Sequence, residues 1–187
     1  MRALRVGVPL AVLVTGLSCG IPQDSHPNIV PGGAIGPALG ATPPGATAAP
    51  AGVDVTVFFV RADRVVPAGR TADRGDVNAA LQSLLSGPRE QELAAGLRTA
   101  MTGPGDVRLL RTEGATAHVD LAAPFVAISG QEQILALAQV VLTATAVPGI
   151  ADVRFSLEGQ PVDVPRGDGT LSPGPLTAMD YASLRGR

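Results

Sequence analysis

Residues 115–158, ATAHVDLAAPFVAISGQEQILALAQVVLTATAVPGIADVRFSLE, decide the fold because they hold a strand, a helix and a second strand in succession. Alternating apolar and polar residues predict strands over 115–121 and 153–157. Between them, Ser129 and Glu132 have the spacing of a capping box and begin an apolar run, which predicts a helix over 130–146. Its expected buried stripe is Ile134, Leu137, Ala138, Val141 and Thr145, widened by Leu135 and Leu142.

The residues before this stretch supply the remaining elements. Alternation predicts a strand over 53–59, which Arg61-Ala62-Asp63-Arg64 is expected to end in solvent. An apolar face predicts a helix over 76–85, and a short helical turn is expected between Pro88 and Gly96. A strand over 107–111 then joins the strand over 115–121 through a tight hairpin, which makes that pair antiparallel.

The order of these elements, β-α-β-β-α-β, predicts the fold class. Each helix has one apolar side and the strands alternate, which favours an α+β two-layer sandwich. We expect an antiparallel or mixed four- to five-stranded sheet with two helices on one face. In a C-terminal extension from about residue 159, Val162 and Val164 suit one more strand beside 153–157, and residues 176–184 suit a return to the core.

The beginning of the chain is typical of an exported protein. Arg2 and Arg5 precede an apolar run that is too short to span a bilayer and that ends at Ser18 and Cys19, the only cysteine. This pattern predicts a lipoprotein signal peptide over 1–18 and lipidation of Cys19, although the residues just before the cysteine depart from the usual lipobox. The alternative is an ordinary secretory signal. Residues 19–52, rich in Pro, Gly and Ala, are expected to form a flexible tether.

Composition argues against several classes of partner. All 14 basic residues are arginine, and removal of residues 1–18 leaves 12 of them against 16 carboxylates, a formal charge of −4. Nucleic acid is a poor partner for such a chain. With one Tyr, four Phe and no Trp, the chain also offers few rings on which bases or sugars could stack.

Few residues could support catalysis. On the strand over 115–121, Thr116, His118 and Asp120 share one face, so Asp120 could orient the His118 imidazole for acid–base work, whereas a solvated sheet face explains the same pattern more simply. Asp73 and Asp76 could hold a cation, but N-capping of the first helix explains them better. We therefore expect no catalytic residue, no metal and no cofactor.

Several landmarks recur in one order along the chain. They are Leu84-Leu85-Ser86-Gly87-Pro88, Gly96-Leu97-Arg98-Thr99-Ala100, Ala117-His118-Val119-Asp120-Leu121, residues 137–145, Pro148-Gly149-Ile150 and residues 153–159. This order resembles the GerMN domain of sporulation and spore germination proteins, in the form of an actinobacterial lipoprotein. The resemblance covers roughly residues 53–184 and implies a small domain of exported, often lipid-anchored proteins, with a role in binding or assembly and no enzymatic activity.

Together these observations predict a GerMN-like domain over 53–187, held at the outer face of the membrane by its lipid anchor. Its expected function is to dock an envelope protein or a cell-wall component, in envelope assembly or signalling. Two alternatives remain open from the sequence. One is a solute-binding lipoprotein, and the other is a weak hydrolase that uses His118 and Asp120.

Overall fold

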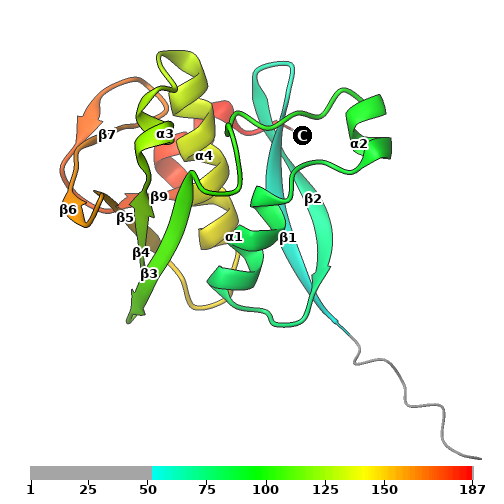
Figure 1. Ribbon diagram of the computed structural model, residues 1–187, viewed down its shortest axis with the longest axis horizontal. Coiled ribbons are helices and arrows are strands. Elements are labelled where there is room, and N and C mark those ends of the chain that lie inside the picture. The colour runs from blue at the N-terminus through cyan, green and yellow to red at the C-terminus, as the bar shows by residue number, and fades with distance from the viewer. Residues whose placement is uncertain (1–51, 187) are drawn as a thin grey trace, which may run out of the picture. The chain divides into compact units, whose positions relative to one another are not determined.

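The computed structural model describes residues 52–186 (Figure 1). Its first element is a hairpin in which β1 (Val53–Arg61) pairs antiparallel with β2 (Arg64–Ala72). Ala62 and Asp63 both have positive φ, 47° and 59°, as a tight two-residue turn with the twist of a hairpin requires. The expectation that residues 61–64 end the first strand in solvent is confirmed, because β1 ends at Arg61 and residues 61–64 are exposed. The strand that follows this turn was missed. Alanine followed by aspartate is not the usual signal for this turn, so β2 was not predicted.

A separate mixed sheet forms the other side of the domain. Its strands β3 (Val107–Glu113) and β4 (Thr116–Leu121) are antiparallel, as predicted, and β4 pairs in parallel with β5 (Asp152–Leu157). Two short strands, β6 (Gln160–Pro161) and β9 (Leu176–Thr177), pair antiparallel with β5. Within the described residues this sheet has five strands, which confirms the predicted α+β class with a mixed sheet.

The predicted helices are present. In the first, α1 (Val77–Leu85), the carboxylate of Asp76 accepts a hydrogen bond from the Ala79 N–H at 2.8 Å, so the capping explanation of Asp76 is confirmed. The short α2 (Glu90–Ala94) follows Pro88. The long helix is α4 (Gln131–Thr145), preceded by the single turn α3 (Ala123–Val126).

The start of α4 differs from the prediction. Its N-cap is Gly130, with φ 61°, and no side chain caps it, so the expected Ser129–Glu132 capping box does not form. Glu132 instead accepts two hydrogen bonds from the Arg98 guanidinium, at 2.6 and 2.9 Å. A tertiary ion pair has therefore replaced the local cap.

Helix α4 is the centre of the core. It lies between the hairpin on one side and the mixed sheet on the other, with α1 beside it (Figure 1). Every residue from Leu135 to Ala144 is buried, rather than a single stripe. Two of these residues are polar and hold β1: Gln139 donates to the Phe58 carbonyl at 2.8 Å and accepts from the Ala100 N–H at 2.8 Å, and Thr143 accepts from the Phe58 N–H at 3.1 Å.

The C-terminal extension returns to the core, as predicted for residues 176–184. Leu176 in β9 and Tyr181 in the 3₁₀ helix η1 (Ala178–Leu184) are fully buried. The expected strand at 162–164 is only partly correct: β6 takes the position beside β5, whereas β7 (Val164–Pro165) pairs with β8 (Leu171–Ser172). The Tyr181 hydroxyl donates to the Pro165 carbonyl at 2.7 Å and so ties η1 to β7.

Candidate functional site

The face of the mixed sheet that points away from α4 carries three cross-strand rows of polar side chains. Register places His118 between Arg111 and Arg154, and Asp120 between Arg108 and Ser156. A third row is formed by Glu113, Thr116 and Asp152. Their neighbours Ala117, Val119 and Val153 are buried on the opposite face. We call this surface the open face, and it includes His118 and Asp120, the two residues that the sequence analysis considered for acid–base work.

Asp120 lies on the open face but is buried, contrary to the expectation of a solvated side chain. The turn after β5 covers it: Asp120 accepts hydrogen bonds from the Ser156 hydroxyl at 2.5 Å and from the Gly159 N–H at 2.8 Å, and Arg108 lies 3.4 Å from its second oxygen. Burial raises the pKa of Asp120, but these hydrogen bonds and the Arg108 charge lower it by more, so its pKa is below the usual range. Asp120 therefore serves to hold β4, β5 and the turn at Gly159 together.

His118 has a different partner. Its Nε2 lies 3.4 Å from a carboxylate oxygen of Glu113, which also lies 3.3 Å from Arg111. None of the hydrogen-bond partners of Asp120 in the described residues is His118. The two side chains suggested for a weak hydrolase thus share a strand face without forming a catalytic pair, because Asp120 is directed to the turn and His118 to the edge strand.

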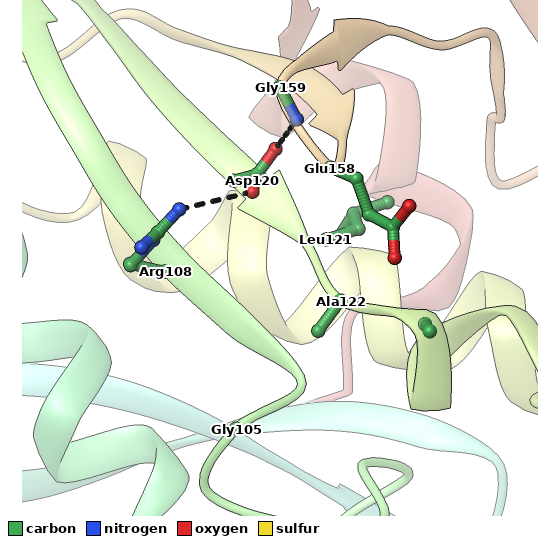
Figure 2. Close-up of a pocket in the computed structure, with 8 residues that line it drawn as sticks. Gly105, Arg108, Asp120, Leu121, Ala122, Glu158 and Gly159 are labelled. Atoms are coloured by element: carbon green, nitrogen blue, oxygen red, sulfur yellow. Dashed lines mark hydrogen bonds and ion pairs between the residues drawn. The ribbon is translucent and has the colours of Figure 1, made fainter.

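A cleft of about 510 Å³ lies where the parallel strands β4 and β5 end (Figure 2). It is lined by Gly105, Arg108, Asp120, residues 121–123, Glu158 and Gly159. Figure 2 shows Asp120 bound to Arg108 and to Gly159, while the Glu158 carboxylate points away from both. The carboxylates of this cleft do not converge on one point, and no cluster of metal-binding side chains occurs within residues 52–186.

Two further hollows lie over the middle row, Arg111, His118 and Arg154. One, of about 380 Å³, is lined by that row together with Glu113 and Thr116. The other, of about 250 Å³, is lined by the row together with Leu110, residues 155–156, Gly159 and Pro161. The sequence analysis missed this row, although the alternation in β5 already placed Arg154 outward, because it takes the parallel pairing of β4 with β5 to bring Arg154 next to His118.

A bulge completes the row. The register between β3 and β4 shifts between Leu109 and Arg111, so Leu110 has no partner on β4. An extra residue of this kind re-aims the side chains around it. Leu110 is accordingly 42% exposed and Arg111 faces His118.

Several sequence predictions fall elsewhere. Asp73 takes no part in a metal cluster within the described residues, and its neighbour Asp76 serves as a cap. The predicted signal peptide, Cys19 and almost all of the tether lie outside the described residues. None of the helices within residues 52–186 combines the length and the apolar composition of a membrane-spanning segment.

Comparisons with known proteins agree with the fold. Residues 47–163 match the model of a family described as "Germane: Sporulation and spore germination". Among curated proteins, none gives a significant match.

Two solved structures are similar to the chain. The first GerMN domain of the sporulation protein GerM from Bacillus subtilis has a TM-score of 0.55 and 20% identity, over 68% of this chain and 98% of that one. The tandem GerMN domains of the same protein give 0.51 and 22%, over 68% of this chain and 45% of that one. The chain thus spans less than half of the tandem protein. At these identities the likeness concerns the fold.

Proposed function

The chain belongs to the Germane family of sporulation and spore germination domains, and from that premise we propose that it is a non-enzymatic lipoprotein of the cell envelope. Its domain docks an envelope protein or a cell-wall component, in envelope assembly or signalling. Cys19 carries the lipid that holds it at the outer face of the membrane.

The open face is the observation that carries the docking role. Its three rows are fixed by backbone pairing across β3, β4 and β5, and the buried Asp120 locks the turn beside them. The backbone of such a surface is ordered before it meets a partner, so binding does not have to order it. Asp120, which could have oriented His118 for acid–base work, instead holds this scaffold together.

The segment before the domain supports tethering. Residues 19–52 are 34 residues of Pro-, Gly- and Ala-rich sequence. A flexible chain of that length has a root-mean-square end-to-end distance of about 30 Å. This distance would let the domain reach partners near the membrane while Cys19 stays anchored.

The test compares Cys19→Ser with the wild-type chain in cells, and uses Ser25→Ala as a matched control that alters the same segment but keeps the thiol. We expect the wild type and Ser25→Ala in the membrane fraction and Cys19→Ser in the soluble extracytoplasmic fraction. Cross-linking followed by purification should recover an envelope partner with the anchored forms. Retention of Cys19→Ser in the membrane would contradict the anchor. If Cys19→Ser is released from the membrane but still binds the partner and causes no phenotype, tethered docking is contradicted.

A further inference from the structure

We propose that the middle row of the open face, Arg111, His118 and Arg154, binds the phosphate groups of a phosphodiester polymer of the envelope. We call these three residues the cationic row. The inference rests on the proposed function, because a domain at the outer face of the membrane is the one that would meet such a polymer. It narrows the docking role to the cell-wall alternative.

The geometry of the cationic row suits an extended anion. Its residues come from three adjacent strands: β3 supplies Arg111, β4 His118 and β5 Arg154, all paired directly across the sheet. Neighbouring strands lie about 4.8 Å apart, so the row extends about 10 Å across the sheet. Donors repeated along a line fit a chain with repeated phosphates better than they fit one isolated ion.

The two guanidinium charges of the row are available to a ligand. Arg154 is exposed and has no ion-pair partner among the described residues. Arg111 and His118 share the carboxylate of Glu113. The His118 side chain is only 17% exposed, but those of Arg111 and Glu113 are 59% and 70% exposed. Ion pairs so open to water are weak. A phosphate can therefore displace Glu113, and its oxygens match the fork of donors on each guanidinium.

The lining of the larger hollow favours a phosphate polymer over a segment of protein. Besides the cationic row it contains Glu113 and Thr116, so no apolar side chain contributes to it. The core of a protein interface is apolar and enriched in Tyr, Trp, Phe and Met, none of which lines this hollow. The smaller hollow next to it adds Leu110 and Pro161, which can contact the carbon atoms between successive phosphates.

The positive charge of the row is opposite in sign to the net charge of its domain. Residues 52–186 contain 11 arginines and 15 carboxylates. General attraction between the domain and polyanions is therefore unfavourable. Binding of a phosphate polymer must come from a local site, which makes the effect of single substitutions diagnostic.

The experiment is titration calorimetry of the full chain with a short synthetic glycerol phosphate oligomer at low ionic strength. Three variants carry the argument. Arg154→Gln removes the unpaired cation, and we expect affinity to fall roughly tenfold. Glu113→Gln removes the competing carboxylate, and we expect affinity to rise several-fold. Arg74→Gln, an exposed arginine between β2 and α1, makes the same change in charge elsewhere and should leave affinity unchanged.

Two further probes separate the sources of phosphate. Inorganic phosphate should bind more weakly than the oligomer and should lose that binding in Arg154→Gln. Vesicles that contain phosphatidylglycerol should bind more weakly than the oligomer at equal phosphate concentration. Circular dichroism of each variant confirms that it is folded.

Several results would overturn the proposal. They are absence of oligomer binding by the wild type, an equal loss in Arg74→Gln and Arg154→Gln, and binding to the anionic vesicles alone. Its failure is distinguishable from failure of the proposed function. If Arg154→Gln still captures the same envelope partner, docking stands and the cationic row does not carry it. If Cys19→Ser remains in the membrane, the anchor is wrong whatever the oligomer shows.

Discussion

Replacement of Gln139 by leucine tests the account of the core most directly. The Gln139 side chain is fully buried on α4 and satisfies two backbone groups, the Phe58 carbonyl and the Ala100 N–H, both at 2.8 Å. Leucine has a similar volume but no polar atom, so Gln139→Leu leaves both groups unpaired inside the protein. An unpaired buried polar group costs about 1–3 kcal/mol.

The sum for two such groups is about 2–6 kcal/mol, and part of it is offset because leucine is easier to bury than glutamine. We expect a loss of about 3 kcal/mol in the free energy of unfolding. That is a large share of the 5–15 kcal/mol typical of a domain, and for a domain of this size it lowers Tm by roughly 10 °C.

The assay is urea denaturation of the full chain, followed by circular dichroism. Gln133→Leu is the matched control: it lies on the same helix, is partly exposed, and should change the free energy of unfolding by less than about 0.5 kcal/mol. Thr143→Val removes the acceptor for the Phe58 N–H, so it should be destabilising and non-additive with Gln139→Leu, because both act on Phe58. If Gln139→Leu is as stable as the wild type, the polar contacts between α4 and β1 do not support the hairpin and the reasoning is refuted.

Three further predictions concern titrating groups outside that contact. The hydrogen bonds from Arg70 lower the pKa of Glu92, so the contribution of Glu92 to stability is present above about pH 4.3 and is lost as the pH falls. Between about pH 6 and pH 3, the free energy of unfolding of Glu92→Gln should therefore fall by less than that of the wild type. Burial raises the pKa of Tyr181, so the contribution of Tyr181 to stability is present below about pH 10 and is lost as the pH rises. Because Tyr181 is the only tyrosine, its phenolate absorbance should appear only together with alkaline unfolding. A phenolate signal in the folded protein would contradict its burial. Asp120→Asn weakens the hydrogen bonds to Ser156 and Gly159, so the free energy of unfolding measured by urea denaturation should fall by about 1–3 kcal/mol. An unchanged denaturation midpoint would mean that the turn at Gly159 closes without the carboxylate.

The candidate site shows how far sequence patterns reach. Alternation correctly assigned the outward residues of β4 and β5, and so placed His118 and Arg154 on the open face. It could not show that Asp120 is buried, because the turn at Gly159 that covers it belongs to a different part of the chain. Nor could it place Arg111 in the row, since the bulge at Leu110 changes the alternation of β3. Contacts between distant segments decided these points.

The residues of the sequence by themselves determined the element types over most of residues 53–157, the α+β class and the family resemblance, because periodicity, turns and caps such as Asp76 are local properties of the chain. The features that depend on contacts between distant segments were decided by tertiary structure alone. Burial of α4 on all sides, its grip on β1 through Gln139 and Thr143, and the exchange of a predicted cap for the Arg98–Glu132 ion pair all depend on partners dozens of residues away. The cationic row also depends on tertiary structure, because Arg154 comes beside His118 only through the parallel pairing of β4 with β5.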